Sequence, residues 1–429
     1  MAGGLMQLVA YGAQDVYLTG SPKVTFFQAV YKKHTNFAME TIEQTVNGSA
    51  GSGNRISVTV ARNGDLVGEM YLELETSNAL TDVSANNAVD ANWCAERAVE
   101  SVELTVGGQR VDKHYQRWWR LYSELNRDSA KKAQYDKMTT AVGVAGQRAY
   151  LPLIFFFNRN PGLYLPLIAL QYHEVRLDFE LTNVYDNYFK SSPKVWANYV
   201  YLDTEERRRF AQGSHEYLIE QVQHTGTDSV STSGSADQKR LSYNHPVKEL
   251  VWCYTEESTV GDTNGLWNFT NDGVNVQLVC NLAADETMRP DVAGGCPHLK
   301  GVTTTNEGWL EEAPMGTNTH CGALDKFKLV LNGQDRFKEQ QGKYFNQVQP
   351  QYHHSGNPYP GIYCYSFALK PEEHQPTGTC NFSRIDNAQV SPTLKSAWGG
   401  SSTATQHMFA VNYNVLRIQS GMGGLAFSN

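Results

Sequence analysis

The sequence has no apolar run long enough to cross a bilayer, which takes about 20 residues. Its most apolar stretches, Leu151–Phe157 and Leu163–Leu170, are short and are interrupted by Pro152 and Pro166. The first residues, Met1–Leu5, also lack the basic segment and following apolar segment that a secretory signal needs. We therefore expect neither a membrane-spanning segment nor an export signal.

An excess of positive charge is missing as well. Lys and Arg number 36 against 44 Asp and Glu, so the formal net charge of the 429-residue chain is −8. Contact with phosphate groups normally requires a basic surface. The charge balance therefore disfavours a nucleic-acid-binding protein, and we expect no direct contact with nucleic acid.

Cysteine is sparse, with seven residues spread along the chain. An odd number without a C-x-x-C pair does not indicate a disulfide framework, and free, buried thiols in a reducing compartment are the expectation. Some of these cysteines share a region with four histidines, but the spacings match no zinc module and we expect no metal site. The residues of this region are Cys296, His298, His320, Cys321, His353 and His354.

Catalytic motifs are also lacking. His215–Ile219 begins like the zinc motif H-E-x-x-H, but Ile219 stands where the second histidine is needed. No G-x-S-x-G elbow and no G-x-x-x-x-G-K-[ST] loop occurs, and no helix follows the glycine cluster Gly421–Gly424 to present its N-terminus to phosphate. We predict that the protein is not an enzyme, with no catalytic residue and no cofactor.

What the sequence does contain is alternation of apolar and polar residues with a period of two, which is typical of strands. Long intervals rich in Gly, Asn, Ser and Thr separate these segments, and the repeated helices of a parallel α/β fold are missing. We predict an all-β, antiparallel sandwich, in which the first two segments form a hairpin around Asn63–Asp65. The segments are Ile56–Val60, Met70–Leu74, Val102–Val106, Val175–Leu181, Val274–Leu278, Phe327–Leu331 and Val411–Val415.

One stretch, from Asp112 to about Met138, has a helical period instead. Its aromatic and apolar residues recur at spacings of three and four, which predicts one amphipathic helix inserted between strands. An aromatic stripe can be a ligand platform, but packing against a sheet is the expectation. The stripe consists of Tyr115, Trp118, Trp119, Tyr122 and Leu125.

The two halves of the chain resemble each other. Leu104–Arg110 and Val330–Arg336 each end a strand at a glycine turn, and a Tyr- and Phe-rich strand follows in both halves, at Tyr150–Phe157 and Ile362–Leu369. This repeat predicts two sandwiches of about 200 residues each. Between them, in Asp203–Phe210, three arginines follow acidic residues, and we expect a solvated connection rather than a phosphate or lipid site.

Longer stretches that run in order along the chain carry a more specific signal: Ala10–Gly20, Thr25–Phe27, His34–Ala38, Gly107–Tyr115, Leu151–Asn158, Leu165–Val175, Leu331–Phe337, Tyr365–Pro371, Gly378–Asn387 and Tyr413–Ile418. Together they strongly resemble the major capsid proteins of nucleocytoplasmic large DNA viruses, above all the algal-virus branch. Residues 75–98 and 255–320 match no part of this pattern.

The resemblance implies two tandem eight-stranded jelly rolls, with small helical insertions, in a structural protein of the virion. Three chains would form a pseudo-hexagonal capsomer, and capsomers would tile an icosahedral shell. The implied parts are an N-terminal arm over 1–25, a first jelly roll over 26–203, a linker over 204–215 and a second jelly roll over 216–429. The implied partners are further copies, minor capsid proteins and, through the arm, an internal viral membrane, with assembly in the host cytoplasm.

Asn47, Asn268 and Asn381 lie in sequons and are candidate glycosylation sites. The alternative function is a jelly-roll protein for carbohydrate binding or host attachment, in which exposed aromatic side chains stack on sugar rings. Its candidate aromatics are Trp267, Trp309 and Tyr359. An enzyme of the cupin kind is a third hypothesis, but it needs clustered His and carboxylate ligands, and no motif supplies them.

Overall fold

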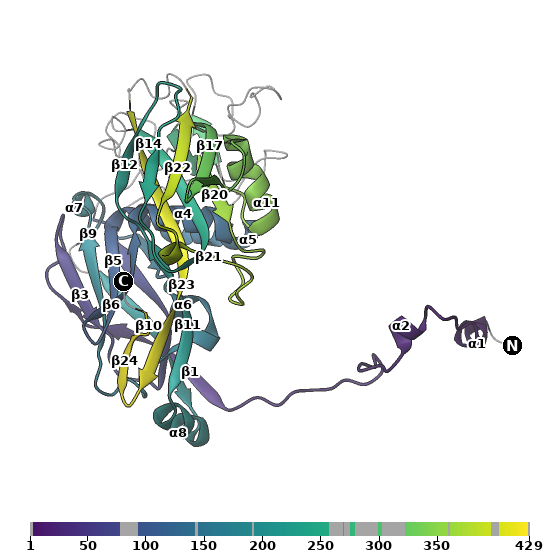
Figure 1. Ribbon diagram of the computed structural model, residues 1–429. Helices are drawn as coiled ribbons and strands as arrows, with labels where there is room; N and C mark the ends of the chain where they lie inside the picture. Colours follow the sequence, from purple (N-terminus) through teal and green to yellow (C-terminus); the bar gives the residue numbers. More distant parts are fainter. Residues whose placement is uncertain are drawn as a thin grey trace. The chain divides into compact units, whose positions relative to one another are not determined.

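The computed structural model of the chain falls into two compact units, Met1–Phe37 and Ala38–Asn429, here called the arm and the body (Figure 1). Within the residues it describes, no helix is long and apolar enough to span a bilayer. The described residues are 3–77, 93–141, 145–190, 193–256, 269, 275–278, 299–302, 322–358, 361–395 and 403–427.

The arm contains two short helices, α1 (Gly3–Val9) and α2 (Val16–Thr19), joined and followed by extended chain. Neither helix buries a single residue. The arm thus has no hydrophobic core of its own.

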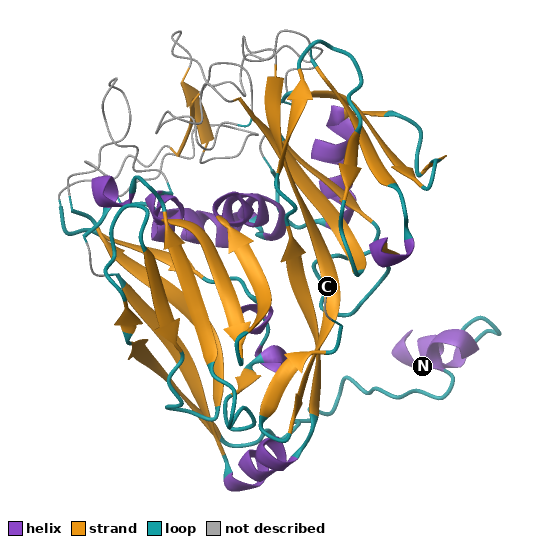
Figure 2. Ribbon diagram, turned by 60° about the vertical axis from the view of Figure 1, so that its left-hand side comes forward, coloured by secondary structure: helices purple, strands orange, loops and turns teal. Residues whose placement is uncertain are grey.

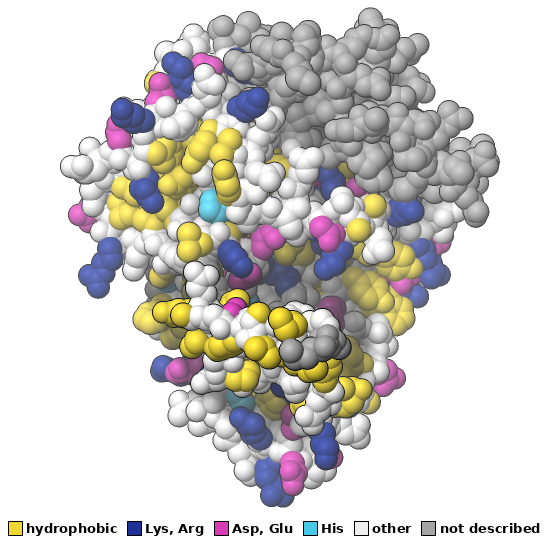
Figure 3. All heavy atoms as spheres, turned by 90° about the vertical axis from the view of Figure 1, so that its right-hand side faces the viewer, with side chains coloured by type: hydrophobic (Ala, Val, Ile, Leu, Met, Phe, Trp, Pro, Cys, Tyr) yellow, Lys and Arg dark blue, Asp and Glu magenta, His cyan; other side chains and the backbone are white. Residues whose placement is uncertain are grey.

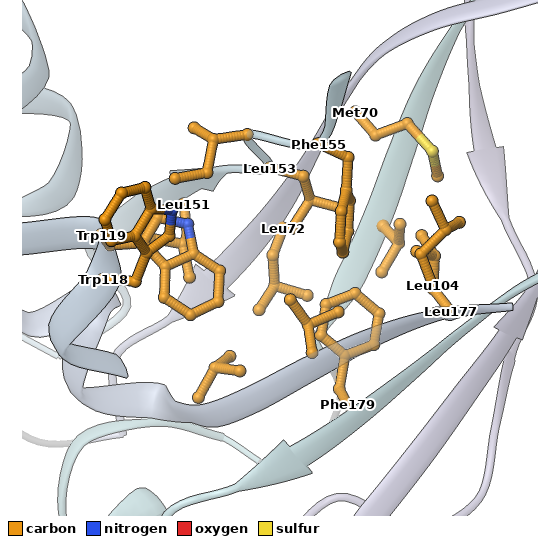
Figure 4. Packing of buried hydrophobic residues seen from close by; sticks show 14 of the residues in the cluster. Met70, Leu72, Leu104, Trp118, Trp119, Leu151, Leu153, Phe155, Leu177 and Phe179 are labelled. Atoms are coloured by element: carbon orange, nitrogen blue, oxygen red, sulfur yellow. The ribbon is translucent and has the colours of Figure 1, made fainter. Parts of the chain in front are cut away.

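The first part of the body is a sandwich of two five-stranded sheets. One sheet has the order β1 (Phe37–Gln44), β10 (Lys194–Leu202), β4 (Leu66–Glu75) and β7 (Arg148–Pro152), with β8 (Leu165–Pro166) paired to β4. The other has the order β2 (Val46–Asn47), β3 (Arg55–Thr59), β9 (Val175–Leu181), β5 (Val99–Val106) and β6 (Gln109–Tyr115). Alternate residues of both sheets, among them Leu72, Leu104 and Phe179, meet in one core (Figure 4).

The second part repeats this architecture. Its larger sheet has the order β11 (His215–Gln223), β23 (Thr403–Gln419), β14 (Pro246–Glu256) and β20 (Ile362–Ser366), with β12 (Thr227–Ser231), β21 (Cys380–Asn381) and β24 (Met422–Leu425) beside it. The facing sheet has the order β13 (Lys239–Leu241), β22 (Ala388–Leu394), β17 (Leu324–Leu331) and β18 (Gln334–Asp335), with β19 (Gln340–Gln341) paired to β17. A separate pair joins β15 (Asn275–Leu278) and β16 (Leu299–Val302). Trp252 lies in the core and stacks on Phe327, with ring centroids 4.5 Å apart.

The two sandwiches match in strand order, which confirms the predicted double jelly roll. The order β1-β10-β4-β7 in the first corresponds to β11-β23-β14-β20 in the second. The repeated glycine turns also correspond, because Gly107 and Gly108 have φ values of 58° and 82°, and Asn332 and Gly333 have 49° and 78°. Two consecutive positive φ angles define the tight hairpin turn that favours Asn-Gly and Gly-Gly pairs.

The helical insertion differs from its prediction. Instead of one helix from Asp112, strand β6 continues to Tyr115, and two helices follow, α4 (Gln116–Asn126) and α5 (Ser129–Thr139). The chain breaks between them because the side chain of Asp128 caps α5, accepting a hydrogen bond from the Lys131 amide at 2.8 Å. The remaining helices of the first half are α3 (Cys94–Ala98), α6 (Phe156–Arg159), η1 (Pro161–Leu163) and α7 (Tyr185–Tyr188).

The predicted hairpin around Asn63–Asp65 is wrong, although both of its strands exist. Strand β3 pairs with β2 and β9, whereas β4 pairs with β7, β8 and β10 in the opposite sheet. The connection crosses the sandwich because Asp65 is held by β10: its amide donates to Val200 O at 3.1 Å, and its carboxylate accepts from the Leu202 amide at 2.9 Å. The strand predicted over Tyr150–Phe157 likewise ends at Pro152, and α6 follows.

The charged run between the jelly rolls forms helix α8 (Thr204–Gln212), which buries no residue. Arg207 pairs with Asp65 at 3.0 Å through its Nε. The second half has short helical segments η3 (Tyr344–Val348), α11 (Gln349–His353) and η4 (Phe382–Arg384). Figure 2 shows how little of the body is helical relative to the strands.

Candidate functional site: assembly surfaces and the jelly-roll junction

The arm carries most of the exposed hydrophobic surface. Of the 21 large hydrophobic side chains that are exposed among the described residues, 14 belong to the arm, and Phe27 is 99% exposed. Figure 3 shows hydrophobic side chains gathered on one face of the molecule. Uncovered apolar surface of this extent marks an interaction site. The 14 are Leu5, Met6, Leu8, Val9, Tyr11, Val16, Tyr17, Leu18, Val24, Phe26, Phe27, Val30, Tyr31 and Phe37.

The charge of the arm is opposite to that of the whole chain. Its charged side chains are Asp15, Lys23, Lys32 and Lys33, so it is net positive in a protein of net charge −8. Apolar and basic residues together suit a surface that is apolar and acidic, whether a protein or a lipid layer.

The second assembly feature is the junction between the jelly rolls inside the body. Trp118 of α4 is 3% exposed because it packs against Phe409 of β23, with ring centroids 5.6 Å apart. Tyr115 packs on the same phenyl ring at 6.2 Å. The aromatic stripe therefore packs against a sheet, as predicted, and that sheet belongs to the other jelly roll.

Polar contacts also connect the two jelly rolls at this junction. Glu220 of β11 accepts from Lys248 at 2.6 Å and pairs with Arg159 of α6 at 2.9 Å. Burial disfavours the carboxylate of Glu220, but the two cations outweigh burial and its pKa is lowered. The Gly356 amide also donates to Leu125 O, at the end of α4, at 2.8 Å. Bonds of this number and burial join the jelly rolls into one body.

A polar cavity of about 270 Å³ opens at this junction, lined from both jelly rolls by residues that include Tyr122, Arg159, Lys248 and Glu249. Beside it, His354 lies 3.2 Å from Glu249 and 3.5 Å from Glu372. Burial acts to lower the pKa of His354, but Cys364 and these two carboxylates outweigh burial and raise it well above its usual value. The charges of the cavity thus pair with one another.

No metal centre is found in the part of the chain that the structure describes, where no three His, Cys, Asp or Glu side chains are grouped as ligands. The Nδ1 of His353 donates to Leu369 O, 3.0 Å away, and His354 is held by the carboxylates above. The other members of that histidine and cysteine region, Cys296, His298, His320 and Cys321, lie outside the described residues. The described cysteines Cys94, Cys253, Cys364 and Cys380 form no disulfide with one another.

A buried ion network, which sequence analysis missed, lies beneath α4. Arg120 is 0% exposed and lies 3.3 Å from Glu124, 3.7 Å from Asp136 and 3.8 Å from Glu96. Its guanidinium also stacks over the Trp93 ring at 3.9 Å. Lys132 pairs with Glu124, and the Tyr135 hydroxyl donates to Glu96 at 2.6 Å. The network thus contains two cations and three carboxylates.

Proton uptake by Glu96 balances these charges. Burial raises the pKa of Glu96 from 4.5 to about 7, although Arg120 and the hydrogen bond from Tyr135 act in the opposite direction. Between pH 4.5 and 7 the folded chain holds a proton that the unfolded chain has lost. Stability is therefore expected to fall as the pH rises through this interval.

The variant Glu96→Gln tests this expectation, because an amide is shaped like the protonated acid but does not titrate. The wild-type free energy of unfolding should fall by on the order of 3 kcal/mol more than that of the variant between pH 4.5 and 7. Denaturation midpoints measured across this pH range would show the difference. Parallel pH profiles for the two proteins would contradict the assignment.

The candidate glycosylation sites lie in different surroundings. Asn47 is exposed at the end of β2, and Asn381 is exposed at the end of β21, where its Oδ1 accepts from the Ser383 amide at 3.0 Å. Asn268 lies outside the described residues, as do Trp267, Trp309 and Tyr359 of the carbohydrate-binding hypothesis.

Comparison with known proteins agrees with a double jelly roll built for assembly. Residues 206–424 match the family described as large eukaryotic DNA virus major capsid protein, and residues 25–203 match the family described as major capsid protein N-terminus. The chain belongs to this family of viral capsid proteins, which confirms the resemblance read from the sequence.

Individual relatives support the same conclusion. The major capsid protein of Paramecium bursaria Chlorella virus 1 is 44% identical, and that of Phaeocystis pouchetii virus 39% identical, each over 100% of both chains. The structure of a chain in the quasi-atomic model of the PBCV-1 virus capsid matches with a TM-score of 0.73 at 39% identity, over 94% of this chain and 100% of that one. The Faustovirus major capsid protein shares the fold, with a TM-score of 0.66 at 12% identity, over 97% of this chain and 96% of that one. The protein is a structural component of a viral shell.

Proposed function

We propose that three copies of this chain close into a pseudo-hexagonal capsomer and that capsomers tile the icosahedral shell of a large DNA virus. The observation that supports this most strongly is the repetition of one strand order in two sandwiches within one compact unit. Three copies of two similar sandwiches present six similar corners, so a threefold trimer can occupy a hexagonal lattice. The role is structural rather than catalytic, with no cofactor.

The division of the chain follows from this role. The N-terminal segment 1–25, which is the first part of the arm, leads into the first jelly roll over 26–203, a linker over 204–215 and the second jelly roll over 216–429. Because each chain contains two similar sandwiches, the six corners of the capsomer are alike. The linker keeps the two sandwiches of one chain next to each other. Asn47, Asn268 and Asn381 stay candidates for glycans on this shell.

The arm docks on inner components of the virion, namely minor capsid proteins or an internal membrane. Its support is the exposed apolar and basic surface of Met1–Phe37, which the arm itself does not bury. A shell subunit with net charge −8 has no need to contact DNA directly. Assembly around such inner components would take place in the host cytoplasm.

Deletion of Met1–Thr25 tests the role of the arm. Because no core residue of either sandwich lies in this segment, the truncated chain should fold and form trimers like the full chain. Its incorporation into shells in infected or co-expressing cells should fall at least tenfold. A truncated chain that does not fold, or one that enters shells normally, would contradict this role.

A further inference from the structure

The strand pairing within the two jelly rolls relates their outward faces. Leu72 and Trp252 are core residues of the corresponding strands β4 and β14, and each pairs with a core residue of the next strand, Leu151 or Tyr363. One residue earlier, Tyr71 pairs with Trp196 and Val251 pairs with Phe409. Trp196 in the first jelly roll and Phe409 in the second therefore lie on corresponding outward faces.

In the second jelly roll this outward face is covered. Val251, Cys253, Ile362, Cys364, Phe409 and Val411 are all 3% exposed or less and belong to the core cluster of the first jelly roll. Helix α4 covers them through Trp118, as described above. The covering helix comes from the insertion between β6 and β7 of the neighbouring sandwich.

In the first jelly roll the described part of the chain leaves the corresponding face partly exposed. Tyr71, Tyr150 and Trp196 are only partly buried, and Tyr71 and Tyr150 pack edge to face at 5.9 Å. Met39, 52% exposed, lies on the same face as Thr41, whose hydroxyl donates to Asn198. The face also carries the carboxylates of Glu69 and Glu73, which accept from Asn198 and Trp196. We call this set, Met39, Glu69, Tyr71, Glu73, Tyr150 and Trp196, the open face.

The second jelly roll has its own counterpart of α4. Segments η3 and α11 lie between β19 and β20, as α4 and α5 lie between β6 and β7, and Figure 1 shows α11 beside β20. Three apolar side chains are exposed here: Val348 at 38%, Tyr352 at 78% and Leu369 at 74%. Leu369 adjoins α11 through the contact of its carbonyl with His353. Residues 343–353 include Lys343 and no acidic residue. We call Val348, Tyr352 and Leu369 the helix patch.

We propose that the helix patch of one copy packs on the open face of a second copy, repeating between chains the contact that α4 makes within the chain. This interface deepens the proposed capsomer and rests on it. The two surfaces are complementary, because an exposed helix bearing an aromatic side chain meets an aromatic face. Because the two surfaces differ, each copy contacts one neighbour through its helix patch and the other neighbour through its open face. Three such contacts close a ring.

Cross-linking tests the interface directly. A photoreactive benzoylphenylalanine replaces Tyr352 in the full-length protein, and the cross-linked peptides of the trimer are identified by mass spectrometry. We expect links between chains to segments 37–44, 66–75, 148–152 or 194–202. Links between chains to any other segment would overturn the interface while leaving the trimer itself intact.

Variants of the two surfaces provide an independent test. Tyr352→Asp and Met39→Asp each place a carboxylate in the contact and should raise the trimer dissociation constant at least about 30-fold. Tyr172→Asp, at another aromatic side chain 75% exposed, is the matched control and should leave the trimer unchanged. A trimer as stable in Tyr352→Asp and Met39→Asp as in Tyr172→Asp would overturn the interface. A wild-type chain that stays monomeric would instead contradict the capsomer.

Mixing the two variants distinguishes this ring from a symmetric contact. The Met39→Asp chain retains its helix patch, and the Tyr352→Asp chain retains its open face. Together they should form a 1:1 dimer that does not close into a trimer, whereas each variant alone stays monomeric. A homodimer of either variant alone would contradict the pairing of unlike surfaces.

Discussion

Replacing Arg120 with Met is expected to lower the free energy of unfolding by about 3–5 kcal/mol, because it strands buried carboxylates without their cation. Glu124 and Asp136 lie 3.3 and 3.7 Å from this guanidinium, and all three side chains are at most 1% exposed. Met fills a similar volume, so the loss reflects charge rather than a cavity. The denaturation midpoint in guanidinium chloride measures the effect.

Arg208→Met is the matched control for this prediction. Arg208 is exposed on α8, a helix without a buried residue, so its replacement should change stability by no more than about 0.5 kcal/mol. Equal midpoints for Arg120→Met and Arg208→Met would mean that the buried network does not support the fold.

Trp118→Ala should also cost about 3–5 kcal/mol, because it removes the aromatic side chain that fills the junction between the jelly rolls. The Trp118 ring packs against Tyr122 of its own helix and Phe409 of the second sandwich, with ring-centroid distances of 6.0 and 5.6 Å. The same denaturation measurement applies, and the transition should broaden as the sandwiches uncouple.

Tyr352→Ala is the natural comparison for this second prediction. Tyr352 occupies the corresponding helical insertion but is 78% exposed in the single chain, so its loss should change monomer stability by no more than about 0.5 kcal/mol. The difference between the two stability changes distinguishes Trp118, which is covered within the chain, from Tyr352, which is proposed to be covered by a second copy. A large loss for Tyr352→Ala, or none for Trp118→Ala, would contradict the correspondence between the two insertions.

Alternation along the sequence predicted individual strands well. The predicted segment Val175–Leu181 is strand β9, and its residues alternate between buried and more exposed as the pattern requires. Alternation is a local property, however, and pairing is not. The segments over Ile56–Val60 and Met70–Leu74 therefore looked like a hairpin, although β3 pairs with β9, far along the chain, because Asp65 is held by β10.

The helical insertion shows a second limit. The stripe of Trp118 and Trp119 correctly indicated a buried face, but the break before α5 depends on one capping side chain, Asp128. An amphipathic helix normally exposes its charged residues, but Arg120 and Glu124 are both fully buried. Their spacing of four residues was the available signal, and it does not distinguish a surface pair from a buried network.

The assembly surfaces required the structure for the same reason. The repeat of Leu104–Arg110 in Val330–Arg336 predicted two similar sandwiches, but only the strand pairing places Trp196 and Phe409 on corresponding faces. Likewise, the apolar residues of the arm are visible in the sequence, whereas their exposure is a property of the folded chain. Tyr352 gave no signal at all, since one tyrosine among 23 has no period or motif around it.

The solution mass of the purified full-length chain, measured by light scattering after size exclusion, tests the central claim most directly. One chain has a mass of 47.9 kDa, so the capsomer predicts a stable species at three times that mass, 143.7 kDa. A chain that stays at 47.9 kDa at high concentration would contradict a self-assembling capsomer.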